Sequence, residues 1–128
     1  MRVAVLDDYF NRALDLADWA PLQGRADVTV FNEYMGDQDT VAAALADFEV
    51  VVGMRERTPF PAGLIKRLPK LRLLITTGMR NRSFDLDAAR EQGVTVCGTT
   101  GSGSPTSELA IGMMICLMRD IHGQHRSM

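Results

Sequence analysis

Two short segments hold the side chains with the clearest binding chemistry in this sequence. MRERTPF carries Arg55 and Arg57, and TTGMRNRSFD carries Arg80 and Arg82 just after a glycine. A guanidinium pairs with a carboxylate through two parallel hydrogen bonds, and exposed backbone N–H groups beside a glycine can form a concavity for an anion. Together the segments predict a site for a small carboxylate.

A glycine-rich segment, GTTGSGSPTSELAIGMMICLM, runs from Gly98 to Met118. Its first glycines are spaced G-x-x-G-x-G, the reverse of the G-x-G-x-x-G spacing at which a backbone meets a pyrophosphate. Ser104 suits an N-cap and Pro105 suits the first helical position. The segment therefore predicts a flexible connector into a helix rather than a phosphate-binding loop.

Paired acidic residues, Asp7 and Asp8, stand in LDDYF near the start of the chain. A phosphoacceptor receiver domain keeps acidic residues at the end of its first strand, where they hold a metal. It also needs an aspartate after the third strand and a lysine after the fifth, where this sequence has MRERT and CGTTG. A turn and helix cap is favoured for the pair, and the receiver stays as an alternative on fold grounds.

The composition of the chain argues against two classes of binding partner, nucleic acids and membrane surfaces. With 14 Lys and Arg against 16 Asp and Glu, the net charge is -2, which gives no basic field for nucleic acid or a membrane surface. Cys97 and Cys116 each lie inside an apolar run, without the spacing of a metal site or a disulfide framework, so we expect them to pack in the core. The start has no signal-peptide pattern, and we expect a reducing, cytoplasmic setting and no metal.

The loops that carry these residues must be positioned by the strands and helices on either side of them. Short apolar runs predict strands, and segments of helical spacing lie between them. The strands are expected at 2–7, 27–31, 49–53, 71–76 and 94–98, and the helices at 11–19, 39–47, 61–68, 85–92 and 105–121. This alternation predicts an α/β, flavodoxin-like, three-layer fold with a five-stranded parallel sheet in the order 2-1-3-4-5. Nearly continuous apolar strands are typical of a sheet covered on both faces.

The last predicted helix is apolar around almost its full circumference. Such a helix expects burial on every side, although its uncharged core is far shorter than the roughly 20 residues that a bilayer needs. If one side stays uncovered, we expect the chain to self-associate there as a homodimer. His122 and His125 are expected on the surface, and the polar tail 123–128 is expected to fray.

The order of motifs carries a resemblance to a known family. GMRNRSFD is followed by DLDAAREQGVTV and then by TSEL. This order resembles the amino-terminal substrate-binding domain of the D-isomer-specific 2-hydroxyacid dehydrogenases, of the phosphoglycerate dehydrogenase-like kind, over nearly the whole chain. The sequence departs from the family in Arg80, where aspartate is usual, and in Ser107, where alanine usually precedes Glu108.

The resemblance implies an oxidoreductase that uses NAD or NADP and acts on the CH–OH group of a D-2-hydroxy acid, or reduces the 2-keto acid in reverse. It implies a substrate-binding domain over 1–104, a crossover helix over 105–122 and a Rossmann domain beyond residue 128. The family's catalytic arginine, glutamate and histidine would also lie beyond residue 128, so the 128 residues alone are expected to be inactive. A free-standing flavodoxin-like binding domain is the other alternative.

The same resemblance implies which residues meet the ligands. The substrate carboxylate is expected at the backbone amides of the fourth-strand loop, with the third-strand loop lining the same cleft. GTTGSGS would serve as an interdomain hinge near the edge of the cofactor. The substrate-binding residues are expected to be Arg55, Arg57, Thr58, Thr77, Gly78, Met79 and Arg80, with weak cofactor contacts from Ser104 and Thr106.

Overall fold

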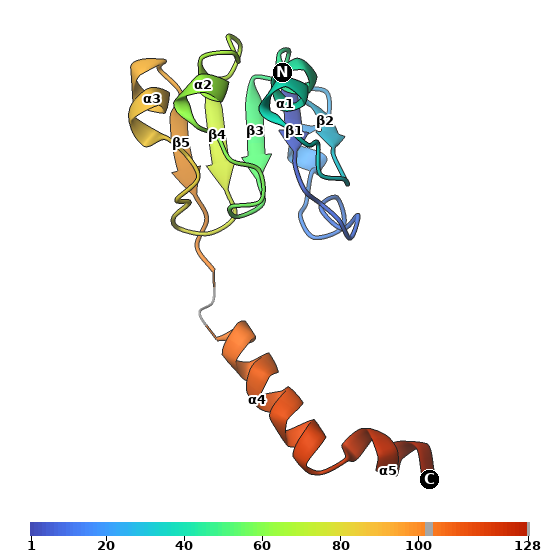
Figure 1. Cartoon of the computed structure of the whole chain (residues 1–128). Coiled ribbons are helices and arrows are strands. Elements are labelled where there is room, and N and C mark those ends of the chain that lie inside the picture. The colour runs from blue at the N-terminus through green and yellow to red at the C-terminus, as the bar shows by residue number, and fades with distance from the viewer. Residues whose placement is uncertain (102–103, 128) are drawn as a thin grey trace.

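A single parallel sheet forms the centre of the computed structural model, which describes residues 1–101 and 104–127 (Figure 1). Its strands are β1 (Arg2–Val5), β2 (Asp27–Val30), β3 (Val50–Gly53), β4 (Leu73–Thr76) and β5 (Thr95–Gly98). Every neighbouring pair is parallel, and the strand order is β2-β1-β3-β4-β5. The flavodoxin-like fold and strand order predicted from the sequence are confirmed.

Short helices cover one face of the sheet (Figure 1). They are α1 (Gln38–Leu45), α2 (Ala62–Ile65) and α3 (Leu86–Glu91). Asp37 and Asp85 cap α1 and α3, since each carboxylate accepts a hydrogen bond of 2.9 Å from a backbone N–H three residues later. These caps fix where each helix begins after its strand.

The main core lies between α1–α3 and the facing side of the sheet. Val51 and Leu74 from the strands, and Leu6 directly after β1, are fully buried in one core with Leu45 and Leu64 from the helices. Alternate strand residues point to the same face, so every second position of β1, β3 and β4 joins this core. Burying a side chain of this size contributes about 1.5–3 kcal/mol to stability, which is enough to hold even the short helix α2 in place.

The helix predicted over 11–19 is wrong. The Asp8 carboxylate accepts hydrogen bonds from the backbone N–H groups of Arg12 (3.0 Å) and Ala13 (2.7 Å), and Asn11 has a left-handed φ of 50°. A left-handed residue interrupts a helix, and a carboxylate that takes local N–H groups stabilises a turn in its place. Only a 3-10 turn at Ala20–Leu22 follows in this crossover.

The second face of the sheet is covered less completely than the sequence predicted. Val3 and Val5 are buried outside the main core, on the side where a right-handed crossover places residues 7–26. At the edge strand β5, Thr95 and Cys97 are exposed. The prediction that all strands are covered on both faces is therefore wrong at β5, and so is the prediction of a buried Cys97.

Two further helices follow the sheet, α4 (Pro105–Met118) and α5 (Ile121–Ser127). No residue of α4 is buried, so the expected burial on every side is absent here and Cys116 is exposed. The predicted helix ends earlier than 121, because Asp120 is left-handed (φ 46°). The tail expected to fray is helical as far as Ser127, while residue 128 lies outside the described part.

The predicted hinge GTTGSGS is described at Gly98–Gly101 and Ser104, and its residues 102 and 103 lie outside the described part. Among the helices of 1–101 and 104–127, none combines the length and the apolar character that crossing a bilayer requires.

Candidate anion-binding site

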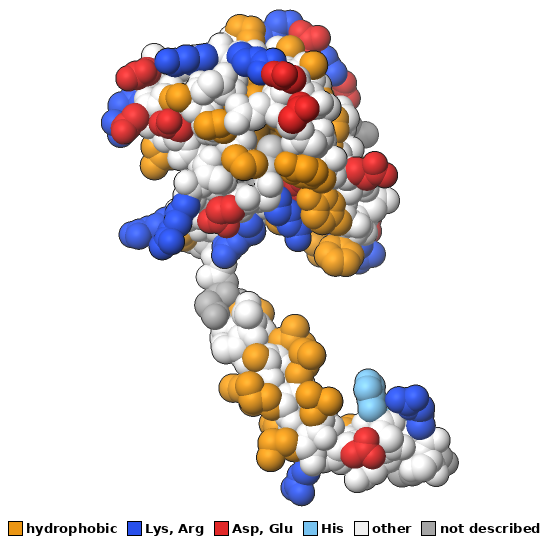
Figure 2. Space-filling view, viewed as in Figure 1, with side chains coloured by type: hydrophobic (Ala, Val, Ile, Leu, Met, Phe, Trp, Pro, Cys, Tyr) orange, Lys and Arg blue, Asp and Glu red, His pale blue; other side chains and the backbone are white. Residues whose placement is uncertain are grey.

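The candidate site lies at the carboxyl ends of the parallel strands, which share one edge of the sheet, the lower edge in Figure 1. β3 pairs with β4 from Val50 opposite Leu73 to Gly53 opposite Thr76. The loops at 54–60 and 77–83 therefore leave the sheet side by side, as the sequence predicted. Figure 2 shows lysine and arginine side chains gathered on this edge of the body.

Gly78 stands at the closest approach between these loops. Its φ is 118°, a left-handed conformation that side chains rarely adopt, and a Cβ there would collide with the Arg55 guanidinium. The Thr77 N–H donates to the Gly53 carbonyl (3.1 Å), and the Gly78 N–H donates to the Thr99 hydroxyl (2.8 Å). The structure thus places a guanidinium and a backbone N–H at one point, with Thr99 as the present acceptor.

Asn81 ties the two loops together, a role that the sequence analysis missed. Its side-chain amide donates to the carbonyl of Arg55 and to the Thr76 hydroxyl (3.0 Å). Its Oδ1 accepts from the backbone N–H (3.0 Å) and the hydroxyl (2.6 Å) of Ser83. An asparagine that caps the residue two positions later is a turn signal, so the N-x-S spacing in RNRS could have revealed it.

A second group of residues surrounds Asp7, which is 1% exposed and has a φ of 59°. Its carboxylate accepts hydrogen bonds from the Thr58 hydroxyl (2.8 Å) and the Tyr9 hydroxyl (3.1 Å). The Arg57 guanidinium donates to the Asp7 carbonyl (2.7 Å) and lies 4.5 Å above the Tyr9 ring. Arg57 is therefore held at the rim of the site, while Thr58 is buried and supports it from inside.

Hydrogen bonds and burial shift the pKa values of two residues in this region, Asp8 and Tyr9. The N–H groups of Ala13 and Arg12 lower the pKa of Asp8 below its ordinary value of 3.8. Burial, with the neighbouring Asp7 as a second cause, raises the pKa of Tyr9. Asp8 stays ionised as the cap of its turn, as the sequence favoured, and the phenol of Tyr9 stays protonated as a donor to Asp7.

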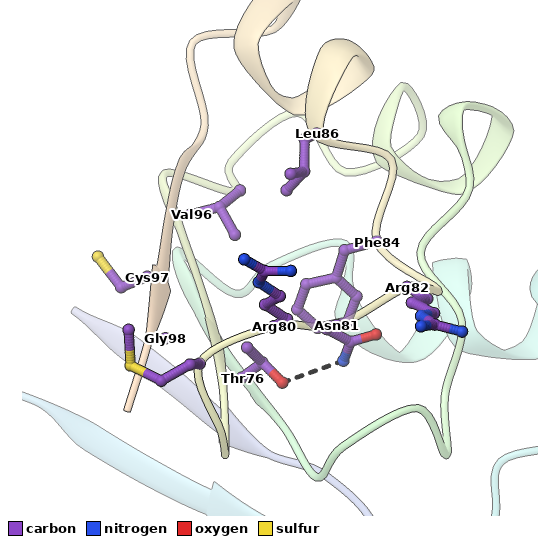
Figure 3. Close-up of a pocket in the computed structure, with 10 residues that line it drawn as sticks. Thr76, Arg80, Asn81, Arg82, Phe84, Leu86, Val96, Cys97 and Gly98 are labelled. Atoms are coloured by element: carbon purple, nitrogen blue, oxygen red, sulfur yellow. Dashed lines mark hydrogen bonds between the residues drawn. The ribbon is translucent and has the colours of Figure 1, made fainter. Parts of the chain in front are cut away.

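Met79 and Arg80 border a further cavity, which neither Arg55 nor Gly78 lines. They line a pocket of about 440 Å³ between the loop after β4, the start of α3 and the end of β5 (Figure 3). Thr76, Phe84 and Val96 form part of its wall. The predicted substrate residues are therefore divided among three neighbouring places: the Gly78 contact, the Asp7 group and this pocket.

The residues predicted for cofactor contact, Ser104 and Thr106, are exposed at the first turn of α4. The Ser104 side chain makes no capping hydrogen bond there. His122 and His125 are exposed on α5. Within 1–101 and 104–127, no three His, Cys, Asp or Glu side chains gather closely enough to hold a metal ion.

A family model decides what kind of protein has this site. Residues 3–110 match the D-isomer specific 2-hydroxyacid dehydrogenase catalytic domain. The chain belongs to this family. The match includes β1–β5, all three parts of the candidate site and the first turn of α4, so the resemblance read from the motif order is confirmed. The receiver alternative is therefore wrong.

Solved structures agree with the family match. The phosphoglycerate oxidoreductase of Vibrio cholerae O395 superimposes with a TM-score of 0.83 at 34% identity, over 96% of this chain and 41% of its own. A putative D-3-phosphoglycerate dehydrogenase of Ralstonia solanacearum gives 0.80 at 35% identity, over 91% of this chain and 34% of its own. Hydroxypyruvate reductase of Thermotoga maritima is 26% identical over 88% of this chain and 37% of its own length. The chain thus spans less than half of each of these relatives.

Proposed function

We propose that this chain is the substrate-binding part of an NAD(P)-dependent dehydrogenase that interconverts a D-2-hydroxy acid and its 2-keto acid. The Gly78 contact carries the proposal, because a guanidinium and a backbone N–H converge there inside the region that matches the family model. Residues 1–104 would bind the substrate, and residues 105–122 would lead to a cofactor-binding unit outside the 128 residues.

The chain's own contribution would be to bind and orient the substrate carboxylate. One carboxylate oxygen would replace the Thr99 hydroxyl as the acceptor of the Gly78 N–H, with the Met79 N–H and the Arg55 guanidinium beside it. Arg57, held by Asp7 and Tyr9, would add positive charge at the rim. Holding the acid in one orientation lowers the entropy cost of a later reaction.

A nicotinamide cofactor would supply the hydride chemistry when bound. The exposed hydroxyls of Ser104 and Thr106 at the start of α4 suit a polar contact with the edge of such a cofactor. Most of its binding energy, the choice of NAD or NADP and the catalytic residues would come from the rest of the enzyme. The free thiols Cys97 and Cys116 fit a reducing, cytoplasmic setting.

NMR titration of the ¹⁵N-labelled chain with pyruvate or glyoxylate tests the binding site. We expect weak binding that moves the amide signals of 76–82 and 99. Thr99→Val removes the competing acceptor, which is worth about 0.5–1.5 kcal/mol for one hydrogen bond, so it should tighten binding two- to tenfold. Arg55→Gln should weaken binding, and Arg72→Gln, an exposed arginine at the other end of the sheet, serves as its control. Unmoved signals at 76–82 would contradict the proposal.

The purified chain should oxidise no NADH in the presence of these keto acids, because the implied catalytic residues lie outside it. Extending the reading frame past residue 128 should restore turnover. Turnover by the 128-residue chain alone would show that the assignment of its domains is incorrect.

We further propose that the chain forms a homodimer through α4. Its apolar side chains are half or more exposed, among them Ile115 at 51% and Met118 at 85%, and a patch of this kind marks an interaction surface. Sedimentation at micromolar concentration should give a dimer that Met114→Lys with Met118→Lys converts to a monomer. A monomeric wild-type chain would exclude the dimer.

A further inference from the structure

The pocket around Arg80 has features that the proposed substrate site does not use. It lies behind the Gly78 loop, between the ends of β4 and β5 and the start of α3 (Figure 3). The Arg80 side chain extends into it toward Val96, and Arg82 lies farther out beyond Phe84. In the part of the chain that the structure describes, neither arginine forms an ion pair with a carboxylate.

The remaining wall of this pocket is mainly apolar. Val96 is half-buried, while Leu86 and Met79 are 53% and 67% exposed although both side chains are large and apolar. Cys97 follows Val96 at the end of β5, and its thiol points away from the pocket (Figure 3). An unpaired guanidinium above exposed apolar side chains matches a ligand with a carboxylate head and an apolar body.

The pocket also has a fixed shape. Phe84 is 5% exposed and packs edge-on against Phe60, with ring centroids 5.3 Å apart. The Thr76 and Ser83 hydroxyls hold Asn81, which precedes this wall. The volume of about 440 Å³ lies within the range of small-molecule sites, about 300–1,000 Å³. A preformed pocket loses little free energy to ordering when a ligand binds.

We propose that this pocket is a second binding site, separate from the Gly78 contact, for a carboxylate that carries an aliphatic or aromatic body. Arg80 binds the carboxylate, and Val96, Leu86 and Met79 contact the body. Binding at this pocket does not depend on the proposed substrate function, because none of these contacts involves the 2-keto group of a substrate.

Octanoate is the test ligand, with acetate providing the charge without the body and octanol providing the body without the charge. In NMR titrations of the full chain at constant ionic strength, octanoate should move the amide signals of 79–86 and 95–98. Acetate and octanol should bind at least tenfold more weakly. Shifts confined to α4, or equal affinities for octanoate and octanol, would overturn the proposal.

Two arginine substitutions distinguish a specific contact of Arg80 with the carboxylate from nonspecific attraction of octanoate to the protein surface. Arg80→Gln should weaken octanoate binding about tenfold, equivalent to about 1.4 kcal/mol, whereas Arg72→Gln at the opposite end of the sheet should leave it unchanged. Both arginines are exposed, so both variants should fold. Equal effects of the two substitutions would overturn the assignment of Arg80.

Discussion

The α1–α3 layer and helix α4 both carry large apolar side chains, but those of the layer are buried and those of α4 are exposed. Leu45 and Leu64 in the layer are fully buried, whereas Leu117 in α4 is 79% exposed. The layer helices have between four and eight residues, and α4 has 14. Isolated helices as short as α2 and α3 are not stable in water, so the layer exists because it packs on the sheet. Apolar side chains show that a segment needs a partner, and the tertiary structure shows whether this chain supplies one.

The largest effect should come from the core under the α1–α3 layer. Phe60 is fully buried and packs edge-on against Phe84. Phe60→Ala should lower the free energy of unfolding by about 3–5 kcal/mol, since the lost contacts leave a cavity. Urea denaturation followed by circular dichroism measures this loss. A loss below 1 kcal/mol would mean that this layer is as loosely packed as α4.

The next effect concerns the site loop. Gly78→Ala places a side chain at a left-handed φ of 118° and against the Arg55 guanidinium, so it should cost about 1–3 kcal/mol and abolish pyruvate binding. Gly24→Ala is the matched control, because its φ is also left-handed (73°) and nothing lies within 4 Å of an added Cβ. If both variants bind pyruvate equally, the Gly78 contact is not the carboxylate site.

A pH-dependent effect is expected in the crossover between β1 and β2. The pKa of Asp8 is lowered by the N–H groups of Ala13 and Arg12, so the ionised carboxylate stabilises the folded state. This stabilisation is complete above the ordinary pKa of 3.8 and is lost as pH falls through the lower folded value. The stability difference between wild type and Asp8→Ala should be constant from pH 7 to about 5 and shrink below pH 3.8. A constant difference down to pH 2 would contradict this.

The smallest effect is expected in α4. Leu117→Ser changes an exposed side chain, so in a dilute monomeric sample it should alter the free energy of unfolding by less than about 0.5 kcal/mol. Under conditions of self-association the same change should raise the dimer dissociation constant. A large loss of stability in the monomer would show that α4 packs on the sheet in solution.

Much of the candidate site could be predicted from the types of its residues and their order in the sequence. Parallel strands end at one edge, so the neighbouring loops with Arg55 and Gly78 were predicted to meet, and they do. The Thr99 contact and the Asn81 contact with the Arg55 loop were missed because these hydrogen bonds join residues 21 and 26 positions apart, whereas the local bond from Asn81 to Ser83 leaves the N-x-S signal. Arg80 was assigned to the same place as Arg55, although adjacent loop residues can point to opposite sides of a loop.

The alternation of apolar strands and helical segments by itself determined the α/β class and strand order, because crossover handedness and strand twist leave few alternatives. The motif order determined the family. The tertiary structure decided the rest. Asp8 and Asn11 formed a turn where apolar spacing predicted a helix, and one face of β5 stayed uncovered, which leaves Cys97 exposed. Burial depends on what packs against a residue, which its own type and spacing do not specify.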